Sequence, residues 1–312
     1  MKDFLNFAMR RTAYGILVVL AVTVVLFAIL QMMPGDAIEL LGGERISQER
    51  IAQMRSQWGL DNPPVVQYFY WLKNLASGNM GMSILTSQEV GTMIMERLPY
   101  TLGLTFSALL VEYLLALPLG LIAGVTRGSW FDRFCVQLTL ILRAIPNFWL
   151  GILLILLFSV KYPLLPISGY QGPSSMILPV LTIALPFVAD TMRLTRAEVA
   201  EVMVERHVTT ARAKGLGEKM ILLRHVLRNA MVPVTVMFFL ALPWLIGGSV
   251  VVETVFAWPG MGRLLWRAVA QQDYPVIQGV IFVIALLTVV SNIIGDIVLS
   301  LIDPRIKGIV KN

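Results

Sequence analysis

The sequence predicts an all-α membrane protein with about six transmembrane helices and a helical insert outside the membrane. Of its 312 residues, 57% are hydrophobic and 14% are charged, whereas a soluble domain carries about 25% charged residues. The mean hydropathy is +0.75. Apolar runs long enough to cross about 30 Å of hydrocarbon recur along the chain. One polar interval, residues 193–231, interrupts them.

The charge pattern excludes nucleic acid as a partner and favours membrane lipid. The net charge is +6 and the sequence pI is about 9.6, but the basic residues flank apolar runs and form no continuous basic face. Cys135 is the single cysteine, and His207 and His225 are the two histidines. No Cys/His cluster has metal-ligand spacing, so we expect no metal site and no cofactor.

The common motifs of nucleotide-binding and catalytic sites are also missing from the sequence. It contains no Gly-x-x-x-x-Gly-Lys-[Ser/Thr] loop for ATP phosphates, no His-Glu-x-x-His and no Gly-x-Ser-x-Gly. We therefore expect a protein that is not an enzyme. Any energy for its work would have to come from a partner.

Residues 1–33 are expected to form a cytoplasmic N-terminus and the first span. Lys2, Arg10 and Arg11 precede an apolar run over 12–33. This run is longer than the apolar core of a secretory signal and lacks a small-residue cleavage site, which indicates a retained span. The positive flank places the N-terminus in the cytoplasm.

Residues 34–98 are too polar to cross lipid and are expected to form an extracytoplasmic insert. Apolar spacing predicts helices at 47–58 and 65–76. The apolar side of the second helix consists of Tyr68, Trp71, Leu72 and Leu75. Two roles stay open for the insert: a satellite that faces the membrane, or a docking surface for an outside protein.

Residues 99–312 are expected to form the core domain with the remaining spans. The predicted spans are 100–124, 134–160, 176–192, 234–252 and 276–302. Lysine and arginine concentrate in the loops that this arrangement places inside. The positive-inside rule therefore puts both termini and residues 193–231 in the cytoplasm.

Two ionisable residues lie deep in predicted spans. A central charge costs about 2.5–3.5 kcal/mol on insertion scales, so Glu112 and Arg143 each need a partner or water. Counted from the inner ends of neighbouring antiparallel spans, both lie roughly 15–18 Å along the axis. An ion pair between them is the favoured interpretation, and a charge that contacts substrate is the alternative.

Proline and glycine interrupt two spans. Pro146, followed by Phe148 and Trp149, breaks the third span, and Pro243 with Trp244 breaks the fifth. Freed backbone groups can line a cavity or permit close helix packing. The candidate pathway residues are Glu112, Arg143, Pro146, Phe148, Trp149, Pro243 and Trp244.

The polar interval 193–231 predicts a helix, a sharp turn and a second helix. Glu198, Glu201 and Glu205 recur on one helical face. Gly215 and Gly217 follow, and glycine reaches φ > 0 without a Cβ clash. A basic helix over 218–229 should then stop before the next proline, at position 233. Such a corner could lie on anionic lipid, but its projection favours docking into a groove of another protein.

The residues of this corner resemble a known family. The run Ala211-Arg212-Ala213-Lys214-Gly215-Leu216, followed by His225-Val226-Leu227-Arg228-Asn229-Ala230, is similar to the cytoplasmic loop of binding-protein-dependent ABC importer permeases. The likeness is closest to the dipeptide, oligopeptide and nickel branch. The wider family begins this loop with Glu-Ala-Ala, where this chain has Thr209-Thr210-Ala211.

Other motifs of that branch occur along most of the chain. They are Gly78-x-x-Gly81-x-Ser83, the Phe-x-Trp-Pro-Gly-x-Gly-Arg run at 256–263, Asp273-Tyr274-Pro275, and the end of the chain at 303–307.

The resemblance implies a type I ABC importer permease in the inner or plasma membrane of a prokaryote. Its coupling loop would dock on an ATPase through Ala211, Arg212, Ala213, Lys214, Gly215, Leu216 and Leu227. Implied partners are a second related permease or a second copy, two cytoplasmic ATP-binding subunits and an extracytoplasmic solute-binding protein. Short peptides are the expected substrate and a nickel chelate is the alternative. A proton-coupled carrier using Glu112 or Asp190 is a further rival, and an intramembrane enzyme is disfavoured.

Overall fold

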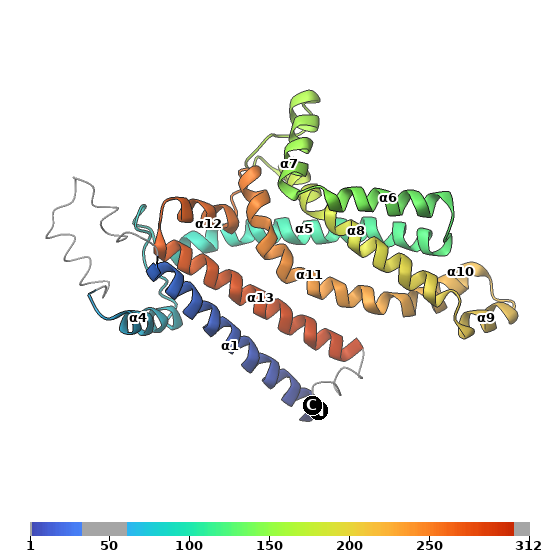
Figure 1. Ribbon diagram of the computed structural model, residues 1–312, viewed down its shortest axis with the longest axis horizontal. Helices are drawn as coiled ribbons and strands as arrows, with labels where there is room; N and C mark the ends of the chain where they lie inside the picture. Colours follow the sequence, from blue (N-terminus) through green and yellow to red (C-terminus); the bar gives the residue numbers. More distant parts are fainter. Residues whose placement is uncertain (1, 33–60, 303–312) are drawn as a thin grey trace. The chain divides into compact units, whose positions relative to one another are not determined.

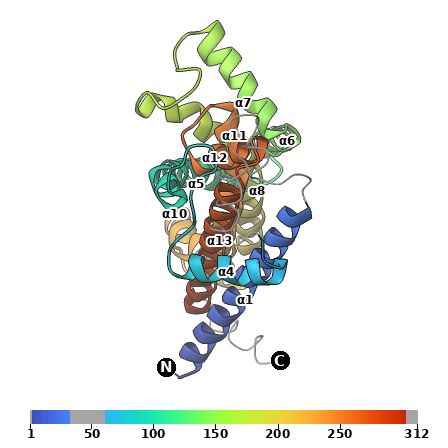
Figure 2. The same cartoon turned by 90° about the vertical axis from the view of Figure 1, so that its left-hand side faces the viewer.

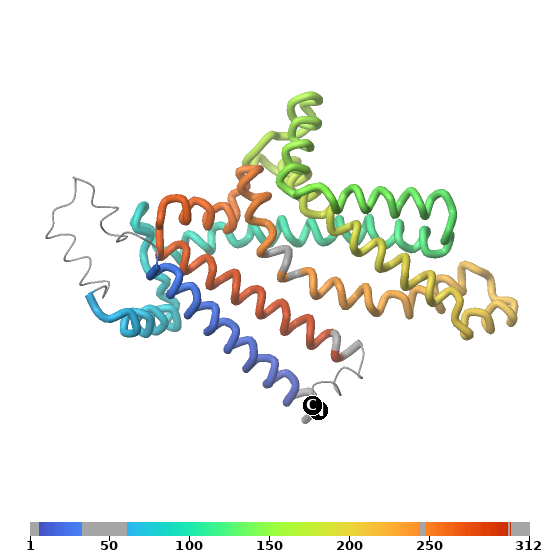
Figure 3. Tube along the Cα trace, viewed as in Figure 1, coloured from blue at the N-terminus to red at the C-terminus, as the bar shows by residue number. Residues whose placement is uncertain are grey.

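The computed structural model describes residues 2–32 and 61–302, which Figure 3 draws in colour apart from a few positions. Within these ranges the regular structure is helical (Figure 1), apart from an isolated antiparallel bridge between Met82 and Glu89. The expected all-α class is confirmed. The helix expected at 47–58 and the motif at 303–307 lie outside the described residues.

Five described helices are long and apolar enough to cross a membrane. They are Asn6–Met32, Val90–Val125, Pro173–Val202, Glu218–Ala241 and Tyr274–Val298. A sixth span results if the bent pair Trp130–Ala144 and Asn147–Lys161 counts as one. The number agrees with the expectation of about six.

One helix runs from the predicted insert into the predicted second span. Helix α5 (Val90–Val125) begins before residue 98, where the insert was expected to end. Its first turns carry Val90, Met93 and Ile94, which are buried. Residues 90–98 are therefore helical because one face packs in a core, and the same helix continues through the span expected at 100–124.

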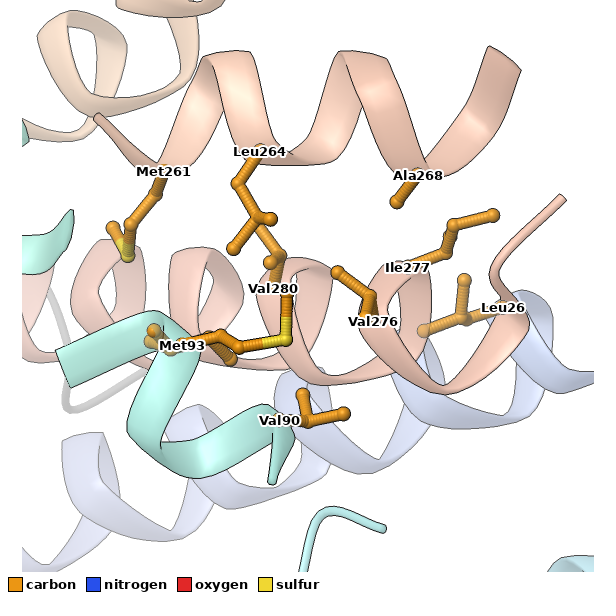
Figure 4. Packing of buried hydrophobic residues seen from close by; sticks show 10 residues of the cluster. Leu26, Val90, Met93, Met261, Leu264, Ala268, Val276, Ile277 and Val280 are labelled. Carbon is orange, nitrogen blue, oxygen red and sulfur yellow. The ribbon is translucent and has the colours of Figure 1, made fainter. Parts of the chain in front are cut away.

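The chain divides into two compact units. The first comprises residues 1–101 and 259–290. It contains α1 (Lys2–Met32), α4 (Pro64–Ala76), the first turns of α5, α12 (Met261–Ala270) and most of α13 (Tyr274–Ile302). Figure 4 shows its apolar core, in which Met93, Leu264 and Val280 interlock. Gly279 permits close packing here, since a Cβ on it would lie 2.6 Å from Val90 Cγ1.

Helix α4 lies across the end of α1 (Figure 2). The Tyr68 ring meets Phe27 edge-on at 5.5 Å, and its hydroxyl lies 3.0 Å from Thr23 Oγ1. Trp71 and Leu72 are half-buried and Leu75 is buried. The amphipathic helix predicted at 65–76 is confirmed, with the predicted side facing inward.

The second unit comprises residues 102–258 and 291–312. Its centre is α8 (Ile177–Val202), which packs against α6 (Trp130–Ala144), α7 (Asn147–Ile155) and α11 (Leu227–Val255). Helix α5 approaches α8 at two glycines four residues apart. A Cβ at Gly120 would lie 2.6 Å from Thr195 Cβ, and one at Gly124 would lie 2.8 Å from Val199 Cβ. Small residues at this spacing let helix backbones come close in a membrane.

The predicted third span is sharply bent. Helices α6 and α7 meet at 100°. Ile145 has the extended φ/ψ of −83°/124° that a following proline favours, and Pro146 occupies the N-cap of α7. The break at Pro146 is confirmed, but the two halves do not form one straight helix.

The predicted break in the fifth span is wrong. Helix α11 runs from Leu227 to Val255 with Pro233 and Pro243 inside it. The stop expected before Pro233 is wrong for the same reason: α10 (Glu218–Ile221) and a π-helical turn, η4 (Leu222–Val226), lead directly into α11. Neighbouring helices can satisfy the backbone groups that a proline frees.

Candidate functional site

The corner at Gly215 is built as a Schellman motif. Helix α9 (Arg206–Ala213) ends there, and Gly215 has φ +77°. Its N–H donates to the Arg212 carbonyl at 2.9 Å, and the Leu216 N–H donates to the Ala211 carbonyl at 3.3 Å. This pair of bonds caps a helix whose C′ residue is left-handed, which suits glycine. The positive φ expected at Gly215 is confirmed, whereas Gly217 has φ −66° and is the N-cap residue of α10.

A small core of apolar side chains lies beneath the corner and supports it. The buried members come from α8, α9, α10, η4 and α11 (Figure 1): Val199, Val202, Val208, Ala211, Ile221, Val226 and Ala230. Of the predicted coupling residues, Ala211 is 4% exposed and belongs to this core. Leu227 is half-buried. Ala211 therefore supports the corner from inside.

The outer surface of the corner combines apolar and basic side chains. Every residue from 212 to 220 is exposed, including the predicted Arg212, Ala213, Lys214, Gly215 and Leu216. Large apolar side chains also face outward here: Val204 is 78% exposed, Met220 51% and Leu223 56%. Arg212 donates to Glu218 across the turn, with Nε–Oε1 at 2.8 Å, and this carboxylate raises the pKa of Arg212.

The acidic face predicted on the first helix is interrupted. Glu198 and Glu201 lie on α8, but α8 ends at Val202, and Glu205 is the N-cap residue of α9. The side chain of Glu205 lies 2.9 Å from His207 Nδ1. His207 Nε2 in turn lies 3.2 Å from Asn229 Nδ2. Glu205 therefore stabilises the turn between α8 and α9 and does not extend the acidic face, because α8 ends before position 205.

The predicted ion pair between Glu112 and Arg143 is wrong. Arg143 Nε lies 3.2 Å from Asp190 Oδ2, and Arg193 Nη2 lies 2.7 Å from the other oxygen of the same carboxylate. Glu112 is 1% exposed and accepts a hydrogen bond from Thr191 Oγ1 at 2.6 Å. Glu112 and Arg143 therefore contact adjacent residues of α8, as expected from their similar predicted depth. The partner of Glu112 is Thr191 and the partner of Arg143 is Asp190.

Glu112 keeps unused hydrogen-bonding capacity. Its Oε2 is buried and has no hydrogen-bond partner within the described residues. A buried acceptor without a donor is costly, and intramembrane ionisable groups are commonly functional. Glu112 remains a candidate pathway residue on this ground.

The other candidate pathway residues do not gather at one point. Pro146, Phe148 and Trp149 are exposed at the bend between α6 and α7. Pro243 is half-buried within α11, and the Trp244 side chain lies outside what the structure describes. Helix α7 packs closely against a neighbouring side chain, since a Cβ on Gly151 would lie 3.1 Å from Phe256 Cε2. Of the two roles considered for the interrupted spans, close packing is the one that α7 shows.

The sequence reasoning missed an ion pair that ties α6 to α8. Arg196 donates to both carboxylate oxygens of Asp132, and the Gly128 N–H donates to Asp132 Oδ2 at 2.8 Å. Ser129 caps α6 by accepting from the Asp132 N–H. The Ser129-x-x-Asp132 spacing is a helix-start signature and could have revealed this cap. Its partner 64 residues away has no local signal.

Two motifs of the resemblance meet in the first unit. Asp273 accepts from Ser83 Oγ at 2.5 Å and from the Ile84 N–H at 3.1 Å. Asp273 is 3% exposed and Ser83 is 3% exposed. Gly81, with φ +81°, sets the turn beside Pro275. These motif residues therefore act here as a structural clamp between a loop and the start of α13.

A multi-pass helical membrane protein with an exposed, packed helical corner is the class that this fold and site define. The family described as "Binding-protein-dependent transport system inner membrane component" matches residues 116–308, and its N-terminal counterpart matches residues 4–105. The chain belongs to this family. It is a membrane component of a binding-protein-dependent transport system, as the resemblance implied.

Named relatives match along nearly the whole chain. A Brucella abortus relative is 39% identical over 96% of this chain and 98% of its own length. The oligopeptide transport system permease protein AppB of Bacillus subtilis is 37% identical, covering 96% and 99%. The glutathione transport system permease protein GsiC of Escherichia coli is 37% identical, covering 97% and 99%.

The fold also resembles a solved structure. A chain of the inward-facing MetNI methionine ABC transporter superposes with a TM-score of 0.56 at 21% identity. The match covers 68% of this chain and 96% of that one. It supports the architecture of the fold.

Proposed function

We propose that this chain is a permease subunit of an ATP-driven ABC importer that takes up short peptides. A second permease, either a homologous chain or a second copy, would complete the pathway. Two cytoplasmic ATP-binding subunits would hydrolyse ATP, and an extracytoplasmic solute-binding protein would deliver the peptide. AppB and GsiC, which are named for oligopeptide and glutathione transport, support the choice of peptides.

The observation that supports coupling most directly is the exposed corner on its own buried core. Residues 212–220 present a surface of apolar and basic side chains, and the packed side chains beneath them continue into α8 and α11. A surface of this kind suits insertion into a groove of a partner protein. Closure of the ATPase subunits would move the corner, and its packing would pass that motion to the spans.

We also propose the orientation and the domain plan. Both termini and residues 193–231 would lie in the cytoplasm, with residues 34–98 outside as the docking region for the solute-binding protein. Residues 99–312 would form the permease core. The distribution of lysine and arginine along the sequence supports this orientation.

The test compares two valine substitutions in the same turn. Gly215→Val forces a β-branched residue to φ +77°, which costs about 1 kcal/mol or more and displaces the docking surface. Gly217→Val adds the same side chain to the same surface without backbone strain, because Gly217 has φ −66° and a Cβ there meets no atom within 4 Å. The difference between the two variants therefore reports the strain at Gly215. In the reconstituted complex, Gly215→Val should retain less ATPase subunit and lose most peptide-stimulated ATP hydrolysis.

Three results would contradict the proposal. Full ATPase retention and full stimulation in Gly215→Val would show that the corner is not the coupling element. Stimulation by a nickel chelate with the binding protein, and none by di- or oligopeptides, would replace the peptide assignment with the nickel one. Uptake that is independent of ATP would favour a proton-coupled carrier.

A further inference from the structure

Three charged side chains of the second unit meet where the end of α6 packs against α8. Arg143 belongs to the last turn of α6, and its Nε lies 3.2 Å from Asp190 Oδ2 on α8. Arg193 lies three residues further along α8, and its Nη2 is 2.7 Å from Asp190 Oδ1. One carboxylate therefore holds two guanidinium groups, Arg143 and Arg193, which we call the arginine pair.

Asp190 occupies only a small part of the donor capacity of the arginine pair. Each guanidinium group carries five N–H donors. In the part of the chain that the structure describes, each arginine contacts one oxygen of Asp190. Glu112, the other acid at this level, accepts from Thr191 and pairs with neither arginine there. Most donors of the pair are therefore available to a ligand.

The arginine pair is accessible although it lies at or within predicted spans. Arg143 is roughly 20 Å along the axis of α6 from its first residue, Trp130. The side chain of Arg143 is 56% exposed and that of Arg193 is 37% exposed. An ionised side chain inside a membrane protein faces other protein or a water-filled cavity, because lipid does not solvate it. The exposed side of the pair is therefore expected to face the interior of the transporter.

The sharp bend of the third span lies directly beside the pair. Helix α6 ends at Ala144, immediately after Arg143, and α7 continues at 100° to it. Interrupted helices at membrane depth are tolerated where they line a cavity, and in transporters they commonly border the substrate. The bend is independent of the charges, and it assigns the same place to the pathway.

We infer that the arginine pair binds the α-carboxylate of the transported peptide, an inference that rests on the proposed function. Arginine can bind a carboxylate through two parallel N–H bonds. Every peptide with a free C-terminus carries this group, whatever its side chains, so such a site accepts many sequences. Asp190 does not contact the peptide carboxylate. It is a positioning residue that orients both guanidinium groups.

The test measures peptide binding to the purified, nucleotide-free complex without its solute-binding protein, so that recognition by that protein does not contribute. Equilibrium dialysis would compare radiolabelled trialanine with its C-terminal amide. The unchanged complex should bind trialanine about 10-fold more tightly, which is the effect of a charged hydrogen-bond partner. Arg143→Gln and Arg193→Gln should each remove most of this difference and leave binding of the amide unchanged.

Two further variants control for charge and folding. Arg127→Gln removes an exposed arginine from the turn before α6 in the same unit, and it should bind both peptides as the unchanged complex does. Arg143→Lys keeps the charge but loses the bidentate geometry, so its preference for trialanine should be intermediate.

Four results would overturn the inference. The first is equal binding of trialanine and its amide by the unchanged complex, and the second is an undiminished preference in both glutamine variants. The third is an equal loss of preference in Arg127→Gln. The fourth is release of a co-purified anionic phospholipid by Arg143→Gln with unchanged trialanine binding, which would assign the pair to lipid. If peptide-loaded binding protein still stimulates ATP hydrolysis, these results leave the proposed function standing, whereas absence of stimulation in the unchanged complex would overturn both.

Discussion

Asp190 connects two arginines of the second unit, Arg143 and Arg193. One of its oxygens lies near Arg143 and the other near Arg193, while its neighbour Thr191 donates to Glu112. In a membrane, each such group needs a partner or water. Removal of one partner from such a set should therefore cost more than removal of both.

A double-mutant cycle should separate the observed pair from the expected one. Arg143→Met and Asp190→Asn should be non-additive, with a coupling of roughly 0.5–1 kcal/mol, since the Arg143 side chain is 56% exposed. Arg143→Met and Glu112→Gln should be close to additive. The measurement is thermal unfolding of the detergent-purified complex. Strong coupling between Glu112 and Arg143 would contradict the structure.

The clamp at Asp273 yields a second prediction at this scale. Asp273→Ala leaves Ser83 Oγ and the Ile84 N–H without their acceptor, which should reduce the free energy of unfolding by about 1–3 kcal/mol. Gln271→Ala is the control, because this nearby side chain is exposed and should change stability by less than about 0.5 kcal/mol. Equal unfolding midpoints for the two variants would show that the clamp contributes little.

Among the elements, the contact of α5 with α8 depends on glycine most directly. Gly120→Ala would place a Cβ 2.6 Å from Thr195 Cβ and 2.7 Å from the Met192 carbonyl oxygen. The helices would have to separate, at a cost of about 1–3 kcal/mol. Thermal unfolding and the yield of folded protein measure this.

Gly103→Ala is the matched control in the same helix. A Cβ at Gly103 meets no atom within 4 Å, so the substitution should be neutral, or stabilising by up to about 1 kcal/mol through helix propensity. If Gly103→Ala destabilised the protein as much as Gly120→Ala, the effect would come from α5 alone and not from its packing on α8.

Element boundaries show where local signals suffice. The bend at Pro146 follows from local backbone restriction, so the sequence predicted it. The proline at 243 has the same local effect, yet α11 continues through it. A helix interior tolerates proline when surrounding helices satisfy the freed groups, and these helices are not adjacent in sequence.

For the whole molecule, the orientation makes a direct prediction. In a Cys135→Ser background, Ser77→Cys in the insert should react with a membrane-impermeant maleimide added outside intact cells. Lys214→Cys at the corner should react only after permeabilisation. Both positions are exposed, so reactivity reports the side of the membrane and not burial. Reaction of Lys214→Cys in intact cells would contradict the proposed orientation.

The sequence by itself determined the class of the molecule, the number of spans and the corner at Gly215. These features depend on local properties: apolar length against the thickness of the bilayer, and the freedom of glycine at positive φ. The residues of the corner motif and its companions also determined the family. None of this requires knowing which helix lies beside which.

The tertiary structure alone decided the partners. Arg143 meets Asp190, and Arg196 meets Asp132. Counting residues placed Glu112 and Arg143 at a similar level, and the two contact adjacent residues of α8. A similar level still leaves the neighbouring helix and the facing side undetermined. These ion pairs form between residues far apart in the chain, so they depend on how the helices pack, which no local pattern encodes.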